Sequence, residues 1–263
     1  MLLVGYLLLG AVAGLTAGLF GVGGGLIIVP ALVFAFSFMD FPATTLTQLA
    51  VGTSLATIVF TSVSSVRAHH EYGNVDWRLF WKLAPAIAVG VVLGVHTAAG
   101  MAGQLLQGLF GCFALLIAAQ MGLGLKPKPS RVVPGRVGLT AAGGVIGYVS
   151  ALFGIGGGSL TVPFLSWSNV VMQKAVGVSA ACGLPIAIVG FATNIWAGWG
   201  REDLPAYSSG FVYWPAFLGV VLTSTLFARF GAKLAQRLPE AHLKRVFALF
   251  LAVVGVQFIY RNF

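Results

Sequence analysis

Charged side chains are scarce in this chain of 263 residues, because only 8% of the residues are Asp, Glu, Lys or Arg, whereas 58% are hydrophobic. Soluble domains carry about 25% charged residues. The apolar runs are long, and they lack the alternation, about ten residues in length, of a membrane β-barrel strand. These absences exclude a soluble domain and predict an all-α, polytopic integral membrane protein whose spans are helices.

Acidic residues are especially rare, and all six lie in expected loops or at the ends of expected spans. They are Asp40, Glu71, Asp76, Glu202, Asp203 and Glu240. A carrier of Na⁺ or metal cations, or a proton relay of carboxylates, normally needs a carboxylate inside the membrane. The placement of the acids therefore favours an anion as the substrate.

Motifs for catalysis and cofactor binding are also missing. The chain has no HExxH motif, its histidines are scattered, and its two cysteines, Cys112 and Cys182, lie in apolar runs as packing residues. A nucleotide-binding glycine loop would need a preceding strand and a following Lys-Ser/Thr, and neither is present. We therefore expect no enzyme activity, no catalytic residue, no metal and no cofactor.

Basic residues are more numerous, with 15 Lys and Arg and a formal net charge of +9. In a soluble protein this excess would suggest nucleic acid as a partner. Here the bases lie in loops beside the apolar runs, where they orient a protein in the lipid bilayer. We expect the bilayer as the surroundings and no nucleic acid.

An unusual glycine-rich stretch occurs twice. The sequence GLFGVGGGLIIVPAL at 18–32 aligns with ALFGIGGGSLTVPFL at 151–165, and nine of the fifteen aligned residues are identical. Glycine weakens a helix by about 1 kcal/mol relative to alanine, so each cluster interrupts its apolar run. A second pair, QLAVGTS at 48–54 and QKAVGVS at 173–179, follows in the same order.

These matches predict an internal duplication, with one transmembrane repeat over 1–128 and a second over 129–263, together forming one transporter domain. The Pro- and base-rich segment 124–136 joins them. The expected helical segments are 2–20, 26–38, 44–66, 79–98, 103–125, 136–153, 159–168, 174–198, 211–230 and 243–261. Segments 26–38 and 159–168 are too short to cross a hydrocarbon core of about 30 Å.

The positions of the bases predict how the repeats are oriented. If each glycine cluster is the tip of a hairpin that returns to its own side, 13 of the 15 bases lie inside and only Arg201 and Arg261 lie outside. If the glycine segments cross the membrane instead, the division is nine against six. We therefore predict two inverted repeats, each with a hairpin and three spanning helices, with the N-terminus outside.

Short, Gly/Pro-interrupted segments in inverted repeats are typical of a secondary transporter whose site lies near the midplane. The start of each short helix presents free N–H groups and about half a positive charge, which suits an anion. The expected binding residues are Gly23, Gly24, Gly25, Gly156, Gly157, Gly158, Ser159, Gln48, Thr53, Ser54, Gln173, Ser179 and Asn194. The alternative roles are close helix packing for the glycines and interhelical hydrogen bonding for the polar residues.

Two histidines are candidates for carrying a coupled proton, because the pKa of histidine is near physiological pH. They are His69, at the far end of a polar segment, and His96, within an apolar run. Loop capping is the alternative for His69, and packing is the alternative for His96.

The two copies of FG-[VI]-GGG-x₃-VP, each followed by AVG-x-S, and the sequence HHEYGNVDW at 69–77 resemble the sulfite exporter TauE/SafE family, the toluene-sulfonate uptake permease group. The resemblance covers essentially the whole chain and implies an inner-membrane carrier of sulfite, thiosulfate, sulfonates or sulfoacetate-like anions, driven by the proton gradient. Members import or export, so the direction does not carry over. A passive anion channel is the alternative function.

Overall fold

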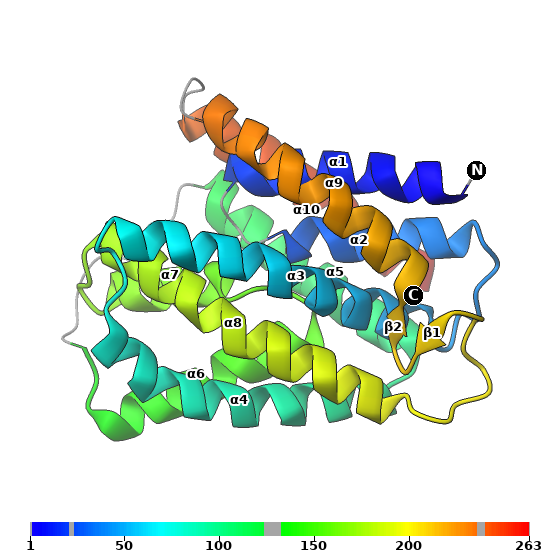
Figure 1. Cartoon of the computed structure of the whole chain (residues 1–263), viewed down its shortest axis with the longest axis horizontal. Helices are drawn as coiled ribbons and strands as arrows, with labels where there is room; N and C mark the ends of the chain where they lie inside the picture. Colours follow the sequence, from blue (N-terminus) through cyan, green and yellow to red (C-terminus); the bar gives the residue numbers. More distant parts are fainter. Residues whose placement is uncertain (1, 21–23, 124–132, 236–239, 263) are drawn as a thin grey trace.

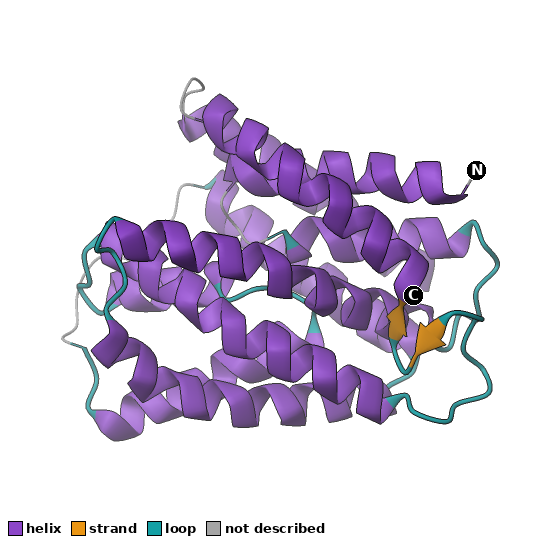
Figure 2. Cartoon of the chain, viewed as in Figure 1, coloured by secondary structure: helices purple, strands orange, loops and turns teal. Residues whose placement is uncertain are grey.

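The computed structural model describes residues 2–20, 24–123, 133–235 and 240–262. Figure 2 shows that these residues are almost entirely helical. The helices are α1 Leu2–Phe20, α2 Gly25–Ser37, α3 Leu46–Glu71, α4 Trp77–Gly100, α5 Gly103–Gly122, α6 Arg136–Leu152, α7 Gly158–Trp167, α8 Met172–Ala197, α9 Trp214–Ala235 and α10 Glu240–Asn262. Every expected segment is present, with ends within five residues of those predicted, which confirms the all-α fold class.

A short β-hairpin before α9 is the one element that the sequence analysis did not predict. Strand β1, Ser208–Ser209, pairs antiparallel with β2, Val212–Tyr213. The turn contains Gly210 at φ +55°, a backbone conformation that glycine adopts without strain. Two-residue strands are too short to give a periodic pattern, so hydrophobic alternation could not have revealed them.

The helices run roughly along the long axis of the molecule (Figure 1). Helix α3 packs against α8, α5 packs against α10, α1 packs against α9, and α6 packs against α4. Each of these pairs joins one half of the chain to the other. Helices α1 to α5 of the first half correspond in order to α6 to α10 of the second half. When each helix is replaced by its counterpart, the same four pairs are obtained.

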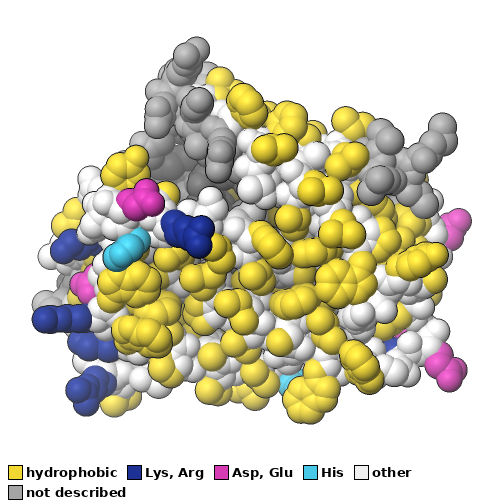
Figure 3. Space-filling view, in the orientation of Figure 1, with side chains coloured by type: hydrophobic (Ala, Val, Ile, Leu, Met, Phe, Trp, Pro, Cys, Tyr) yellow, Lys and Arg dark blue, Asp and Glu magenta, His cyan; other side chains and the backbone are white. Residues whose placement is uncertain are grey.

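Five helices in the described ranges are long and apolar enough to cross a membrane: Leu46–Glu71, Trp77–Gly100, Gly103–Gly122, Met172–Ala197 and Arg245–Asn262. Shorter apolar helices accompany them at Gly5–Leu15, Gly25–Ser37, Arg136–Leu152 and Trp214–Phe227. Hydrophobic side chains cover the middle of the face shown in Figure 3, and charged side chains gather toward the two ends of the long axis. This surface is that of a multi-pass integral membrane protein.

Each short helix forms a hairpin with the helix before it. In Figure 1, α1 starts at the right-hand end of the molecule and α2 returns to that end, whereas α6 starts at the left-hand end and α7 returns there. The described turn between α6 and α7, residues 153–157, therefore lies inside the molecule. It contains part of the second glycine cluster, and Gly24 and Gly25 of the first cluster lie at the start of α2.

Candidate functional site

The first glycine cluster ends at the start of α2. Gly24 is the residue before the helix and has φ 77°, which a side chain would strain. Its carbonyl oxygen accepts the N–H groups of Ile27 and Ile28, both at 2.9 Å. The predicted site residue Gly23 lies outside the described residues, and Gly25 is buried in the first turn.

The second glycine cluster ends at the start of α7. Gly154 adopts φ +65°, and Gly157 is the residue before the helix. The Gly157 carbonyl accepts the Thr161 N–H at 2.8 Å, which begins the helical hydrogen-bond ladder. Gly156 and Gly157 are buried, and Gly158 is partly buried, so this turn is enclosed by protein.

The two clusters touch each other. A Cβ placed on Gly25 would lie 2.5 Å from the Gly154 carbonyl oxygen and 2.6 Å from the Cα of Ile155. Real Cβ atoms do not approach other atoms so closely, so the contact requires glycine at position 25. The start of α2 and the turn before α7 therefore meet inside the molecule.

Three hydroxyl-bearing residues at or beside the start of α7 have no side-chain hydrogen-bond partner among the described residues. Ser159, Thr161 and Ser179 each have a buried side-chain oxygen that bonds to no protein group. Thr161 is fully buried and Ser179 is 2% exposed. Buried hydroxyls are usually satisfied, so such a group indicates a missing partner such as a ligand.

Gly157 lies beside the Thr161 hydroxyl and the backbone of Ser179. A Cβ placed on Gly157 would lie 3.0 Å from the Ser179 carbonyl oxygen and 3.3 Å from Thr161 Oγ1. The Thr161 hydroxyl is thus beside the residue that starts α7, where helix N–H groups are free. The sequence analysis did not select Thr161 as a binding residue, although it aligns with Ile28 of the first copy and is polar at an otherwise apolar position.

Ser54 and Thr53 on α3 lie at the centre of the molecule, but their hydroxyls have protein partners. Ser54 donates to the Gly154 carbonyl at 2.8 Å and so fixes the second turn. Thr53 accepts the N–H of Tyr213 at 3.0 Å. In the described structure, these two side chains hold the turn before α7 and the strand β2 that precedes α9 against α3.

The glycine shared by the two copies of the second motif, Gly52 and Gly177, lies in each copy against a connecting loop. A Cβ on Gly52 would clash with the Phe211 carbonyl oxygen, and one on Gly177 would clash with the Asn74 carbonyl oxygen. Phe211 lies in the loop before α9, and Asn74 lies in the loop before α4. Each half of the chain thus holds, against its central helix, the loop that leads into the fourth helix of the other half.

Asn194 belongs to the contact between α3 and the loop before α9, and not to the tips. Its side-chain Nδ2 donates to the Gly190 carbonyl at 2.8 Å. Its main-chain carbonyl accepts the Phe211 N–H at 3.1 Å. Asn194 therefore anchors the β-hairpin loop.

The two predicted glutamines occupy unlike places. Gln48 is buried, and its Nε2 donates to the carbonyls of Met101 at 2.8 Å and Ala98 at 3.3 Å, at the end of α4. Gln173 is exposed in the first turn of α8. The structure does not bring these two side chains together with the tip hydroxyls.

The two candidate proton carriers also lie apart from the tips. His69 is two residues from the end of α3, and its Nδ1 is buried without a partner among the described residues. His96 is exposed on α4, with its ring 5.7 Å from that of Trp196. The packing alternative therefore fits the position of His96.

Every Lys and Arg side chain that the structure describes is exposed. These residues are Arg67, Arg78, Lys82, Arg136, Lys174, Arg201, Arg245 and Arg261. Arg201 forms an ion pair with Asp203 at 3.0 Å, and this hydrogen bond lowers the pKa of the Asp203 carboxyl. In the described ranges, the positive potential at the tips therefore comes from backbone and not from basic side chains.

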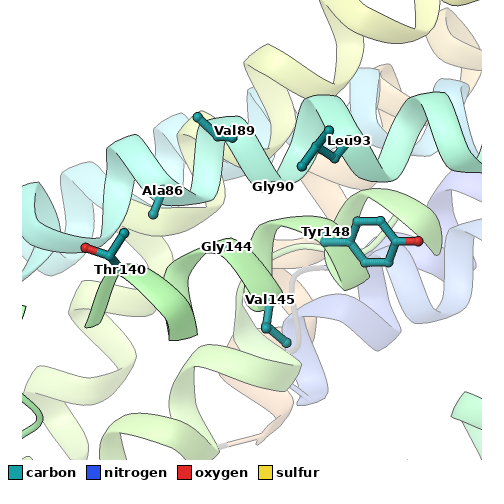
Figure 4. A pocket seen from close by; sticks show the side chains of 8 residues that line it. All are labelled: Ala86, Val89, Gly90, Leu93, Thr140, Gly144, Val145 and Tyr148. Carbon is teal, nitrogen blue, oxygen red and sulfur yellow. The ribbon is translucent and has the colours of Figure 1, made fainter. Parts of the chain in front are cut away.

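A groove on the outside of the molecule lies between α4 and α6 (Figure 4). Its lining is apolar apart from Thr140 and Tyr148, and Gly90 allows the two helices to approach closely, because a Cβ there would clash with the Gly144 carbonyl. Here glycine has the close-packing role that was considered as an alternative for the tips. The groove faces outward and does not reach the glycine clusters.

Comparison with known proteins places these features in a family. A family model described as "Sulfite exporter TauE/SafE" matches residues 6–258. A "Probable membrane transporter protein" of Haemophilus influenzae is 40% identical, with 95% of each chain covered. Proteins of the same description from Methanocaldococcus jannaschii and Bacillus subtilis are 25% and 27% identical over at least 92% of each chain. No solved structure matches.

Proposed function

The chain belongs to the sulfite exporter TauE/SafE family of membrane transporters, and on this premise we propose that it is a secondary carrier of a small sulfur-containing anion. The candidate substrates are sulfite, thiosulfate, sulfonates and sulfoacetate-like anions. The anion binds where the two glycine clusters meet and is exposed to each side of the inner membrane in turn.

One observation carries this proposal: the buried hydroxyls of Ser159 and Thr161, in the first turn of α7, and of Ser179, whose backbone packs against Gly157, have no partners among the described residues. Together with the free N–H groups of the helix they form a set of neutral donors. Such a set matches the oxygens of a sulfonate or sulfite group. Gly157 leaves room for the ligand to approach the backbone, because it has no side chain.

The course of the chain supports the two inverted repeats on which alternating access depends. The α1–α2 and α6–α7 hairpins start from opposite ends of the long axis (Figure 1), and the interhelical pairs map onto each other when the halves are exchanged. A rocking motion of one repeat against the other could therefore open the meeting point of the tips to either end.

The distribution of bases supports an orientation with the N-terminus outside. Six of the eight described Lys and Arg residues lie at or near the end of the molecule where α6 begins. Arg201 and Arg261 lie at the other end, with the N-terminus. Cytoplasmic loops carry the excess of bases, so the end at which α6 begins faces the cytoplasm.

Flux measurements test the proposed function against the alternative of a passive channel. The purified protein in proteoliposomes is offered labelled sulfite, thiosulfate, sulfate, taurine and sulfoacetate, with and without a pH gradient. A carrier gives saturable flux that is accelerated by unlabelled substrate on the far side. Flux without saturation or counterflow would identify a channel, and no flux of sulfite, thiosulfate, taurine or sulfoacetate would exclude the proposed substrates.

A further inference from the structure

We propose that the site selects anions by charge and carries singly charged oxyanions, such as hydrogen sulfite or a sulfonate, in preference to doubly charged ones. This inference rests on the proposed function and deepens it. It concerns the protonation state in which the substrate travels. It also identifies what carries the coupled proton.

The first step is the charge that the site supplies. Each of the two helix starts contributes about half a positive charge, so together they offer about one. The start of α2 contacts the turn that leads into α7, because Gly25 packs against Gly154 and Ile155, three to four residues before α7 begins. Thr161 and Ser179 add neutral hydroxyl donors, both nearly or fully buried and without protein partners.

The second step is that the described helices around the tips place no further cation beside them. The charged and titratable groups on the helices packed around this point, α2, α3, α6, α7 and α8, are Arg67, His69, His70, Glu71, Arg136, Tyr148, Lys174 and Cys182. The four basic and acidic side chains among them are exposed, and both histidines lie in the last turn of α3. Cys182 is buried but carries no positive charge.

The third step compares the two charge states. The cost of removing an ion from water grows with the square of its charge, so a dianion pays about four times the penalty of a monoanion. Two helix starts neutralise roughly one unit of charge and leave the second unit uncompensated in a buried site. A proton on the oxyanion removes that second charge, and the resulting O–H can donate to a hydroxyl oxygen such as Thr161 Oγ1.

The proton is therefore carried on the substrate. Moving hydrogen sulfite across the membrane moves one proton together with one sulfite ion, with no bond to a protein group made or broken. No titratable side chain at the tips is needed for coupling to the pH gradient. This agrees with the positions of His69 and His96, which lie away from the described hydroxyls.

Sulfite flux as a function of pH tests the inference, because sulfite changes from monoanion to dianion near neutral pH. Proteoliposomes are held at equal internal and external pH, and protein-free liposomes correct for passive permeation. We expect the apparent KM for total sulfite to rise about tenfold per pH unit above this ionisation, with little change in maximal flux. A constant or falling KM would overturn the inference while leaving sulfite transport, and so the proposed function, intact.

Two anions of fixed charge complete the experiment. Methanesulfonate, always a monoanion, should inhibit sulfite flux with the same potency at every pH. Sulfate, a dianion throughout this range, should inhibit at least tenfold more weakly. Equal or stronger inhibition by sulfate would contradict the charge selection, whereas absence of flux of sulfite and of every other candidate substrate would contradict the proposed function itself.

Discussion

At the scale of single residues, the tip glycines differ in why a side chain is excluded. Gly24 and Gly154 have positive φ angles, so any side chain there strains the backbone. Gly25 has an ordinary helical conformation but touches the opposite tip. Gly157 has ordinary helical backbone angles. A Cβ at this position would lie nearest to the Ser179 carbonyl and the Thr161 hydroxyl.

Substituting the tip glycines should therefore stop transport. We expect Gly24→Leu and Gly157→Leu to reduce flux to the background of protein-free liposomes, because the first strains the turn and the second fills the space beside Thr161 Oγ1. Gly144→Ala is the matched control, since a Cβ at this helical glycine meets nothing within 4 Å. Wild-type flux in both leucine variants, at equal expression, would exclude the tips as the site.

Removing a single hydroxyl tests whether that group donates a hydrogen bond to the anion, with a smaller change of structure than a glycine substitution. Thr161→Val keeps the shape of the side chain and removes one donor, which should lower Vmax/KM for sulfite by about tenfold or more, as for a lost hydrogen bond to a charged group. Thr97→Val is the control, because the exposed Thr97 hydroxyl donates only to its own helix, at the Leu93 carbonyl. Equal kinetics of the two variants would show that Thr161 does not contact the anion.

At the scale of elements, two loops close the ends of the central helix pair α3 and α8. The loop before α9 lies on Gly52, and the loop before α4 lies on Gly177. The contacts are equivalent under exchange of the halves and lie toward opposite ends of the molecule (Figure 1). A carrier that alternates its access must open one such end at a time.

Alanine at Gly52 or Gly177 should therefore displace one of these loops and increase access to the tips from one side of the membrane. Gly52→Ala pushes away the Phe211 carbonyl, and Gly177→Ala pushes away that of Asn74. The native buried Cys182, next to Gly183 near Gly157, serves as the reporter in a Cys112→Ser background. We expect Gly52→Ala to increase Cys182 labelling by an impermeant maleimide from outside, and Gly177→Ala to increase it from inside.

The controls for this labelling follow from the same contacts. Gly100→Ala adds a Cβ at a helical glycine where nothing lies within 4 Å, so labelling should stay at the parent level. Increased labelling from the same side in both Gly52→Ala and Gly177→Ala would contradict assignment of the two loops to opposite ends of the access path.

Helix positions and the two tips could be predicted from the sequence because each leaves a local signal. Long apolar runs mark the helices, and repeated glycine clusters mark the turns. Gln173 and Asn194 could not be placed in this way, because their partners depend on packing between distant segments: Asn194 meets the loop at Phe211, and Gln173 faces outward. Thr161 was accessible to sequence reasoning through its polar contrast with Ile28, but only the structure shows that its hydroxyl has no protein partner.

At the scale of the whole molecule, the charged ends define an orientation that can be measured. Arg78 is exposed at the end where α4 begins, and Glu202 is exposed at the opposite end beside the β-hairpin. With both native cysteines replaced, we expect Arg78→Cys to react with an impermeant thiol reagent only from the cytoplasm and Glu202→Cys only from outside. The reverse pattern would invert the orientation, and labelling of both from one side would contradict a membrane-spanning axis between them.

The exchange of packing partners between the halves has a consequence for how the protein is made. Helix α1 emerges from the ribosome long before α9, the helix against which it packs. Helices α3, α4 and α5 are likewise synthesised before their partners α8, α6 and α10. The first half of the chain therefore enters the bilayer without its main neighbours. Its short α2 must be sheltered by lipid, water or insertion machinery until the second half is synthesised, so biogenesis of this transporter is completed only after translation of its final helix.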